Sequence, residues 1–127
     1  MTGYTINIEE KTLENENFRE VLYTAQHSQL VVMSLLPDEE IGVEVHEIVD
    51  QFIRVEKGEA KAILDGEEHV LSDGVAIVIT AGTKHNIINT SSVNKLKLYT
   101  IYSPAHHKDK TVHKTKQDAL IDAHDHL

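Results

Sequence analysis

A strong β-hairpin signal lies near the middle of the 127-residue chain, where two strand-like runs meet across Asp65-Gly66. A type I′ turn needs a positive φ at both central residues, and Asp-Gly is a dipeptide that tolerates this. Other short runs rich in β-branched residues end at turn signals such as Pro37-Asp38 and Lys57-Gly58. The expected strands are 29–36, 51–56, 60–64, 67–71, 75–79, 85–89 and 96–102. This pattern predicts an all-β sandwich or barrel.

The composition excludes several classes of function. The chain has 12 Lys and Arg against 21 Asp and Glu, and this formal charge of −9 argues against nucleic acid as a partner. It has no Cys, which leaves imidazole and oxygen ligands for any metal. No apolar run approaches the roughly 20 residues of a membrane span, and the first residues lack a signal-peptide pattern. We therefore expect one domain, no membrane partner and a cytoplasmic location.

Three potential metal ligands are spaced along residues 42–58. Glu44 and His46 are two residues apart, so strand alternation places both side chains on one face. Gln51 follows on the next expected strand, and Gly58 closes the segment at a turn. A carboxylate, an imidazole and an amide oxygen can each bind a divalent metal ion.

A second segment begins at Gly74 and continues through Gly82, His85 and Asn89 at a similarly regular spacing. The two segments, in this order and at this separation, resemble the two motifs of the cupin superfamily. The chain looks like a small single-domain cupin of the mannose-6-phosphate-isomerase-like kind. The resemblance covers roughly residues 28–104.

Three positions depart from the cupin pattern. Glu44 stands where the family has its first motif histidine, Gln51 where it has glutamate, and Thr80 where it has proline. The first two substitutions change the metal ligands without removing them, because all of these side chains can still coordinate. The resemblance implies one divalent metal ion per chain (Zn, Fe, Mn or Ni), bound by Glu44, His46, Gln51 and His85.

The resemblance also implies the fold, a single-domain jelly-roll β-barrel (double-stranded β-helix) over residues 28–104. Residues 1–27 are expected to form an N-terminal arm or edge strands. Residues 105–127 are polar and His-rich, and we expect a solvated tail with a short helix capped by Thr115 and Asp118. The tail histidines are His106, His107, His113, His124 and His126.

Three functions are compatible with such a site. The first is a metal-dependent isomerase or lyase for a small polar molecule such as a sugar derivative, with Glu44 or Tyr99 moving the proton. Tyr99 and Tyr102 face opposite sides of their strand, so at most one lines the barrel. The second is an oxygenase, since Glu44, His46 and His85 have the two-His-one-carboxylate composition of non-haem iron sites. The third is a non-catalytic binding module. A homodimer formed through strand or arm exchange is expected.

Overall fold

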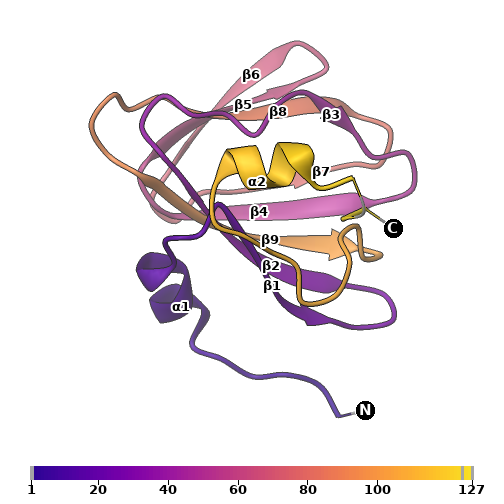
Figure 1. Ribbon diagram of the computed structural model, residues 1–127. Coiled ribbons are helices and arrows are strands. Elements are labelled where there is room, and N and C mark those ends of the chain that lie inside the picture. The colour runs from indigo at the N-terminus through magenta and orange to yellow at the C-terminus, as the bar shows by residue number, and fades with distance from the viewer. Residues whose placement is uncertain (1, 124, 127) are drawn as a thin grey trace.

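The computed structural model describes residues 2–123, 125 and 126, and its strands form two facing antiparallel sheets (Figure 1). One sheet has the order β10 (Val112–His113), β1 (Arg19–Thr24), β2 (Gln29–Leu35), β9 (Leu96–Ser103), β4 (Asp50–Lys57), β7 (Ala76–Ile79). The other has the order β3 (Glu44–Val45), β8 (Lys84–Asn89), β5 (Glu59–Leu64), β6 (Glu67–Ser72). This arrangement confirms the predicted all-β jelly-roll barrel.

The core fills the space between the two sheets. Cross-strand partners share a face, so the pairs Met33–Leu98 and Val55–Leu98 direct three apolar side chains to the same side of the larger sheet. All three are fully buried, as are Ile53 and, from the smaller sheet, Ala62. Truncating one of the larger side chains to Ala typically costs about 2–5 kcal/mol in such a core.

The predicted hairpin is present between β5 and β6. Asp65 has φ 49° and Gly66 has φ 85°, and Leu64 pairs with Glu67 across the turn. Because both central residues have positive φ, the geometry is that of the type I′ class. The local dipeptide signal was sufficient to predict this turn.

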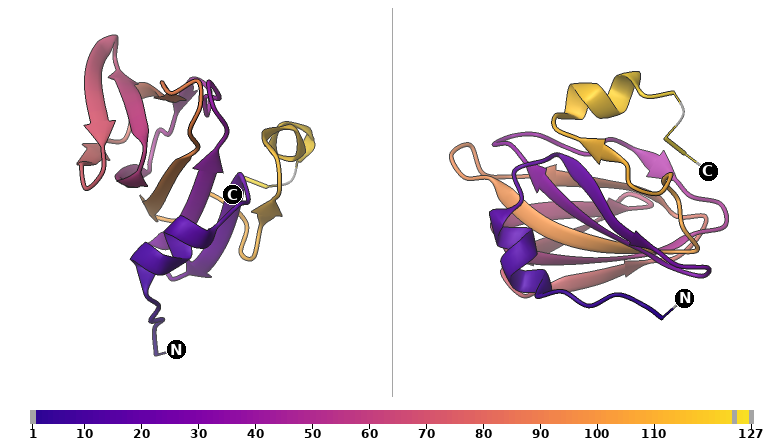
Figure 2. Two further views of the ribbon diagram at one scale, coloured as in Figure 1. Left: turned by 90° about the vertical axis from the view of Figure 1, so that its left-hand side faces the viewer. Right: turned by 60° about the horizontal axis from the view of Figure 1, so that its bottom comes forward.

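Residues 2–27, expected to be an arm or edge strands, form a helix and a strand near one edge of the six-stranded sheet. Helix α1 (Ile8–Glu14) begins at Asn7, whose side chain accepts a hydrogen bond from the Glu10 backbone N–H. It packs outside the six-stranded sheet, where Lys97 donates a hydrogen bond to the Asn15 carbonyl (Figure 2). β1 then joins that sheet between β2 and β10. The helix has few apolar residues, so its stability depends on packing against the sheet. For the same reason, no apolar periodicity predicted a helix at these residues.

The C-terminal residues fold back onto the barrel instead of forming a solvated tail. β10 pairs with β1, and α2 (Lys116–Ile121) lies in front of the opening between the sheets (Figure 1). The predicted cap of α2 is confirmed, since Thr115 and Asp118 form a reciprocal capping box. His107 and His113 are buried, while His124 lies outside the described residues. In the part of the chain that is described, no helix is long and apolar enough to cross a membrane.

Candidate metal centre

Three of the four expected ligands meet at the mouth of the barrel. Glu44 on β3 and His85 on β8 are direct cross-strand partners, so their side chains point to the same face. His46 follows β3, and its ring centroid lies 5.0 Å from that of His85. One donor atom from each of the three residues lies within 4.8 Å of the others. This spacing allows all three to bind one metal ion.

The hydrogen bonding of His85 leaves one ring nitrogen ready for a metal. Its Nδ1 lies 2.9 Å from the carbonyl oxygen of Thr83. A carbonyl can only accept a hydrogen bond, so Nδ1 carries the proton and Nε2 has the lone pair. This Nε2 is buried and has no hydrogen-bond partner within the described ranges. An outer-shell carbonyl that orients a histidine in this way is typical of metal sites.

Gln51 has a similar orphaned acceptor. The residue is 4% exposed on the inner face of β4, directly opposite Tyr102 of β9. Its Nε2 donates a 3.0 Å hydrogen bond to Thr100 Oγ1, which fixes the orientation of the amide. The Oε1 atom is then buried without a hydrogen-bond partner from residues 2–123, 125 or 126. This oxygen fits a neutral fourth ligand, and that role stays a prediction.

Burial sets the charge states of the two ligands near the opening. Desolvation raises the pKa of the Glu44 carboxyl, although Arg19 and His85 partly oppose this effect. Desolvation and the neighbouring His85 lower the pKa of His46 to about 4. His46 is therefore a neutral imidazole at pH 7, as metal coordination requires. Two imidazoles, a carboxylate and an amide oxygen fit a divalent ion of the Fe, Mn, Ni or Zn type.

Tyr99, the expected proton-transfer residue, points away from this site. It lies on the outer face of β9, where its ring stands 6.1 Å from that of Phe52. Tyr102 lies three residues later and so on the opposite, inner face, where it is 2% exposed. Its ring centroid is 6.0 Å from that of His46. The structure therefore brings Tyr102, and not Tyr99, to the candidate metal centre.

Two histidines of the C-terminal segment also reach the site. The His106 ring centroid lies 4.1 Å from that of His46, and His106 Nε2 is buried with no hydrogen-bond partner among the residues described. His107 is fully buried, with Nδ1 2.7 Å from Asp125 Oδ2 and Nε2 3.2 Å from Tyr102 Oη. No local spacing in the sequence connects these residues to His46. Only the folded chain brings them together.

The Asp125–His107–Tyr102 chain has a defined direction. Burial would raise the pKa of Asp125, but the hydrogen bond from His107 and nearby positive charge lower it to about 2. The carboxylate is thus an acceptor, so His107 Nδ1 donates to it and Nε2 accepts from the Tyr102 hydroxyl. Desolvation lowers the pKa of His107 to about 4, and burial raises the pKa of Tyr102. Tyr102 is consequently held as a protonated phenol.

A cavity of about 220 Å³ leads to Glu44. It lies between β1 and the C-terminal helix, and Arg19, Lys116, Leu120 and His126 also line it. Arg19 is 5% exposed, and its Nη1 donates a 3.3 Å hydrogen bond to His113 Nδ1. Two cations thus border this cavity in a protein whose formal charge is −9.

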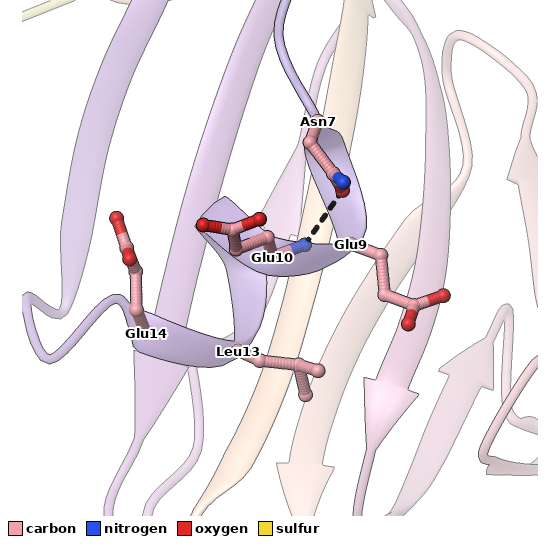
Figure 3. Close-up of a pocket in the computed structure, with 5 residues that line it drawn as sticks. All are labelled: Asn7, Glu9, Glu10, Leu13 and Glu14. Atoms are coloured by element: carbon pink, nitrogen blue, oxygen red, sulfur yellow. Dashed lines mark hydrogen bonds between the residues drawn. The ribbon is translucent and has the colours of Figure 1, made fainter.

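A larger hollow of about 510 Å³ runs along helix α1 (Figure 3). Its lining contains no histidine and consists of Asn7, Glu9, Glu10, Leu13 and Glu14. The three carboxylates are exposed to solvent, where water satisfies them. Despite its volume, this hollow offers no imidazole donor and contains none of the residues of the metal centre.

Comparisons with known proteins agree with the fold. The Cupin domain family matches residues 31–102. Protein L612 of Acanthamoeba polyphaga mimivirus is 52% identical over 107 residues, covering 82% of this chain and 67% of the relative. YrkC of Bacillus subtilis strain 168 is 44% identical over 124 residues, covering 92% and 66% respectively. The chain thus spans about two thirds of the length of these relatives.

Solved structures extend this likeness to the whole fold. The crystal structure of BH2720 from Bacillus halodurans superposes with a TM-score of 0.91 at 40% identity, covering 94% of both chains. The structure of KdgF from Halomonas sp. has a TM-score of 0.67 at 22% identity and covers 83% of this chain and 96% of that one, so it supports the fold alone. This chain belongs to the cupin family. Its motifs, fold and family match all point to the same membership.

Proposed function

We propose that this cupin is a metal-dependent enzyme of the isomerase or lyase type, acting on a small polar substrate such as a sugar derivative. The observation that carries the proposal is the His85 ring, oriented by the Thr83 carbonyl with a buried, unpartnered Nε2 beside Glu44 and His46. When bound there, a divalent ion would act as a Lewis acid toward a carbonyl or hydroxyl of the substrate.

The residues around the donors support proton transfer to or from such a substrate. The Tyr102 O–H is directed at His107 Nε2, so the phenol oxygen is oriented to accept a hydrogen bond from a substrate hydroxyl or a bound water. Glu44, whose pKa burial raises, could serve as a ligand or as the base. The 220 Å³ cavity that reaches Glu44 suits a small molecule. Arg19 and Lys116 on its wall would favour a substrate with an anionic group.

The donor set favours a second candidate function. Glu44, His46 and His85 are two histidines and one carboxylate within 4.8 Å, which is the composition of non-haem iron oxygenase sites. Gln51 does not decide between the isomerase or lyase and the oxygenase. Its neutral amide could bind the metal in either enzyme, or leave that coordination position open. A non-catalytic metal or ligand-binding module is the remaining alternative, since the fold alone does not determine activity.

One series of experiments separates these functions. Protein without an affinity tag is purified anaerobically, its metals are measured by mass spectrometry, and the native metal is restored before assay. Deuterium uptake from D₂O at carbon next to a carbonyl, in a panel of small sugar acids and hydroxyketones, would support the isomerase or lyase. Substrate-dependent oxygen consumption with bound iron would support the oxygenase. Stoichiometric metal without either reaction would leave the binding module as the best description.

The proposal also covers partners and location. A homodimer formed through strand or arm exchange is supported by Val78, which is 64% exposed on β7 at one edge of the six-stranded sheet. The acidic charge supports a protein without nucleic-acid partners. Light scattering coupled to gel filtration would test the dimer. Cell fractionation would test the proposed cytoplasmic location.

A further inference from the structure

The C-terminal segment, residues 105–126 as far as described, is anchored over the barrel mouth by buried polar contacts. Gln29 holds its start, with Nε2 2.7 Å from the His107 carbonyl and Oε1 3.0 Å from the His107 amide. Asp125 holds its end through the 2.7 Å contact with His107 Nδ1. These contacts fix the backbone on both sides of His106 without using the His106 ring. That ring lies beside the His46 ring.

His106 is the histidine whose ring lies nearest to His46. Their centroids are 4.1 Å apart, compared with 5.0 Å between His46 and His85. The His106 Nε2 atom is buried and has no hydrogen-bond partner within the described chain, as is true of His85 Nε2 and Gln51 Oε1. Each buried polar atom left unpaired costs about 1–3 kcal/mol. A metal ion bound to one of these atoms would satisfy it.

We infer that His106 is a further ligand of the metal held by Glu44, His46 and His85, so that metal binding locks the C-terminal segment over the site. The inference rests on the proposed function only for the presence of a metal at those residues. Glu44 occupies the position of a histidine in the cupin motif, and His106 would restore a third imidazole from outside the motif. Because His106 could bind the metal only while the C-terminal segment is docked, the metal would also stabilise the docked segment.

A separate ion held by His106, His107 and His126 is the competing arrangement. One donor atom from each of these residues also lies within 4.8 Å of the others. Both ring nitrogens of His107 are already engaged, however, by Asp125 and Tyr102. His126 is exposed, and its Nε2 stands 3.6 Å from the Asp125 carboxylate. A metal ion bound by His107 in this second group would have to break the buried hydrogen bond of His107 to Asp125 or to Tyr102. His106 Nε2 has no such hydrogen bond to residues of the described chain.

The test uses Co²⁺, whose visible absorption reports ligand number and type. Affinity and spectrum are measured for the full chain and for His106→Ala, His106→Gln and His126→Ala, with His69→Ala as a control far from the site. We expect His106→Ala and His106→Gln to weaken Co²⁺ binding by about tenfold or more and to change the spectrum. His126→Ala and His69→Ala should change affinity by less than about twofold. Circular dichroism verifies that each variant is folded.

Hydrogen exchange tests the coupling to the C-terminal segment. Co²⁺ should slow amide exchange in residues 105–126 of the natural chain but not in His106→Ala. Unchanged affinity, spectrum and metal-dependent protection in both His106 variants would overturn the inference. Binding of two Co²⁺ ions, one of them lost in His126→Ala, would overturn it in favour of a separate second site.

The two hypotheses fail differently. If His46→Ala abolishes Co²⁺ binding while His106→Ala retains full affinity, the metal centre stands and the role of His106 is wrong. If the natural chain and His46→Ala bind Co²⁺ equally weakly, the proposed metal centre itself is wrong and His106 has no metal to bind.

Discussion

The buried imidazole of His107 is joined to the carboxylate of Asp125 by a hydrogen bond of 2.7 Å. The two residues are 0% and 2% exposed, so water cannot replace either partner. This bond connects the segment after β9 to the last part of the described chain. This bond explains how the polar, His-rich C-terminal segment is held against the barrel, although the segment adds no strand to the barrel core.

The Asp125–His107 bond predicts the stability of the C-terminal segment. Asp125→Ala should destabilise the docked segment by about 1–3 kcal/mol, because His107 Nδ1–H would remain buried without its acceptor. Limited proteolysis and hydrogen exchange of residues 105–123 measure this effect. Asp109→Ala, at an exposed carboxylate of the same segment, is the matched control. Equal protection in the two variants would show that the bond does not hold the segment.

Metal content should depend on the two imidazoles from the barrel. His46→Ala and His85→Ala should each abolish stoichiometric metal in protein purified without a tag, since each removes one nitrogen donor from the three-residue group. His69→Ala provides the control, because His69 lies on β6 in an exposed contact with Glu67. Metal near one equivalent in the His46→Ala, His85→Ala double variant would place the site elsewhere.

The two departures from the cupin motif should differ in their effect on metal affinity. Glu44→Gln should weaken binding more than Gln51→Ala, because Glu44 is the anionic member of the donor set and Gln51 is neutral. Gln51→Glu should tighten binding through added charge while making bound water a poorer acid. Titration calorimetry with the native metal measures all three. Unchanged affinity in both Glu44→Gln and Gln51→Ala would remove the two residues from the ligand set.

Metal-free protein should lose stability as the pH falls from about 6.5 toward 4. Burial lowers the pKa of His46 and His107 to about 4 and that of His106 to about 3, from 6.5. In this window the unfolded chain binds protons that the folded chain does not, so the free energy of unfolding falls by roughly 1.4 kcal/mol per pH unit for each such imidazole. Below about pH 4, the lowered pKa of Asp125 further decreases the free energy of unfolding as the pH falls. The raised pKa of Glu44 has the opposite effect, because the folded chain then binds a proton more readily than the unfolded chain.

Urea unfolding in the presence of a chelator, at pH 7.5, 6.5 and 5, measures this pH dependence. His107→Gln should show a shallower dependence than the natural chain, because one neutral buried imidazole is gone. A free energy of unfolding that is constant between pH 6.5 and 5 would contradict the prediction.

Gly58, which closes the first motif, should tolerate no side chain. It has φ 121°, and an added Cβ would lie 3.1 Å from the Lys95 carbonyl oxygen and 3.2 Å from Leu96 Cα. Gly58→Ala should therefore cost several kcal/mol, more than the roughly 1–3 kcal/mol of backbone strain alone. Gly42→Ala is the matched control, because Gly42 has φ 112° and an added Cβ would have no atom of the described residues within 4 Å. Thermal unfolding of both variants compares them, and equal losses would exclude the contribution of the close contact.

Local patterns in the sequence were enough to predict an all-β sandwich or barrel, and the motif resemblance implied the jelly-roll. The Asp65-Gly66 turn and the alternating strands follow from backbone conformation and burial, which act between near neighbours. The Glu44 and His46 pair could be placed on one face for the same reason. The motif resemblance implied that Glu44 and His85 share one site, and the sheet register shows that the two residues are direct cross-strand partners. Strand alternation also limited the inner face to one of Tyr99 and Tyr102, without deciding which.

Tertiary structure decided the rest of the site. Tyr102 faces inward because β9 pairs with β4 in a register that places it opposite Gln51. His106 and His107 reach the centre because Gln29 and Asp125 fix a segment whose polar composition indicated a solvated tail. Such contacts join residues far apart in the chain, and no spacing rule relates them. The sequence by itself determined the β-barrel and its two motifs, while long-range packing alone decided which other side chains surround the motif residues.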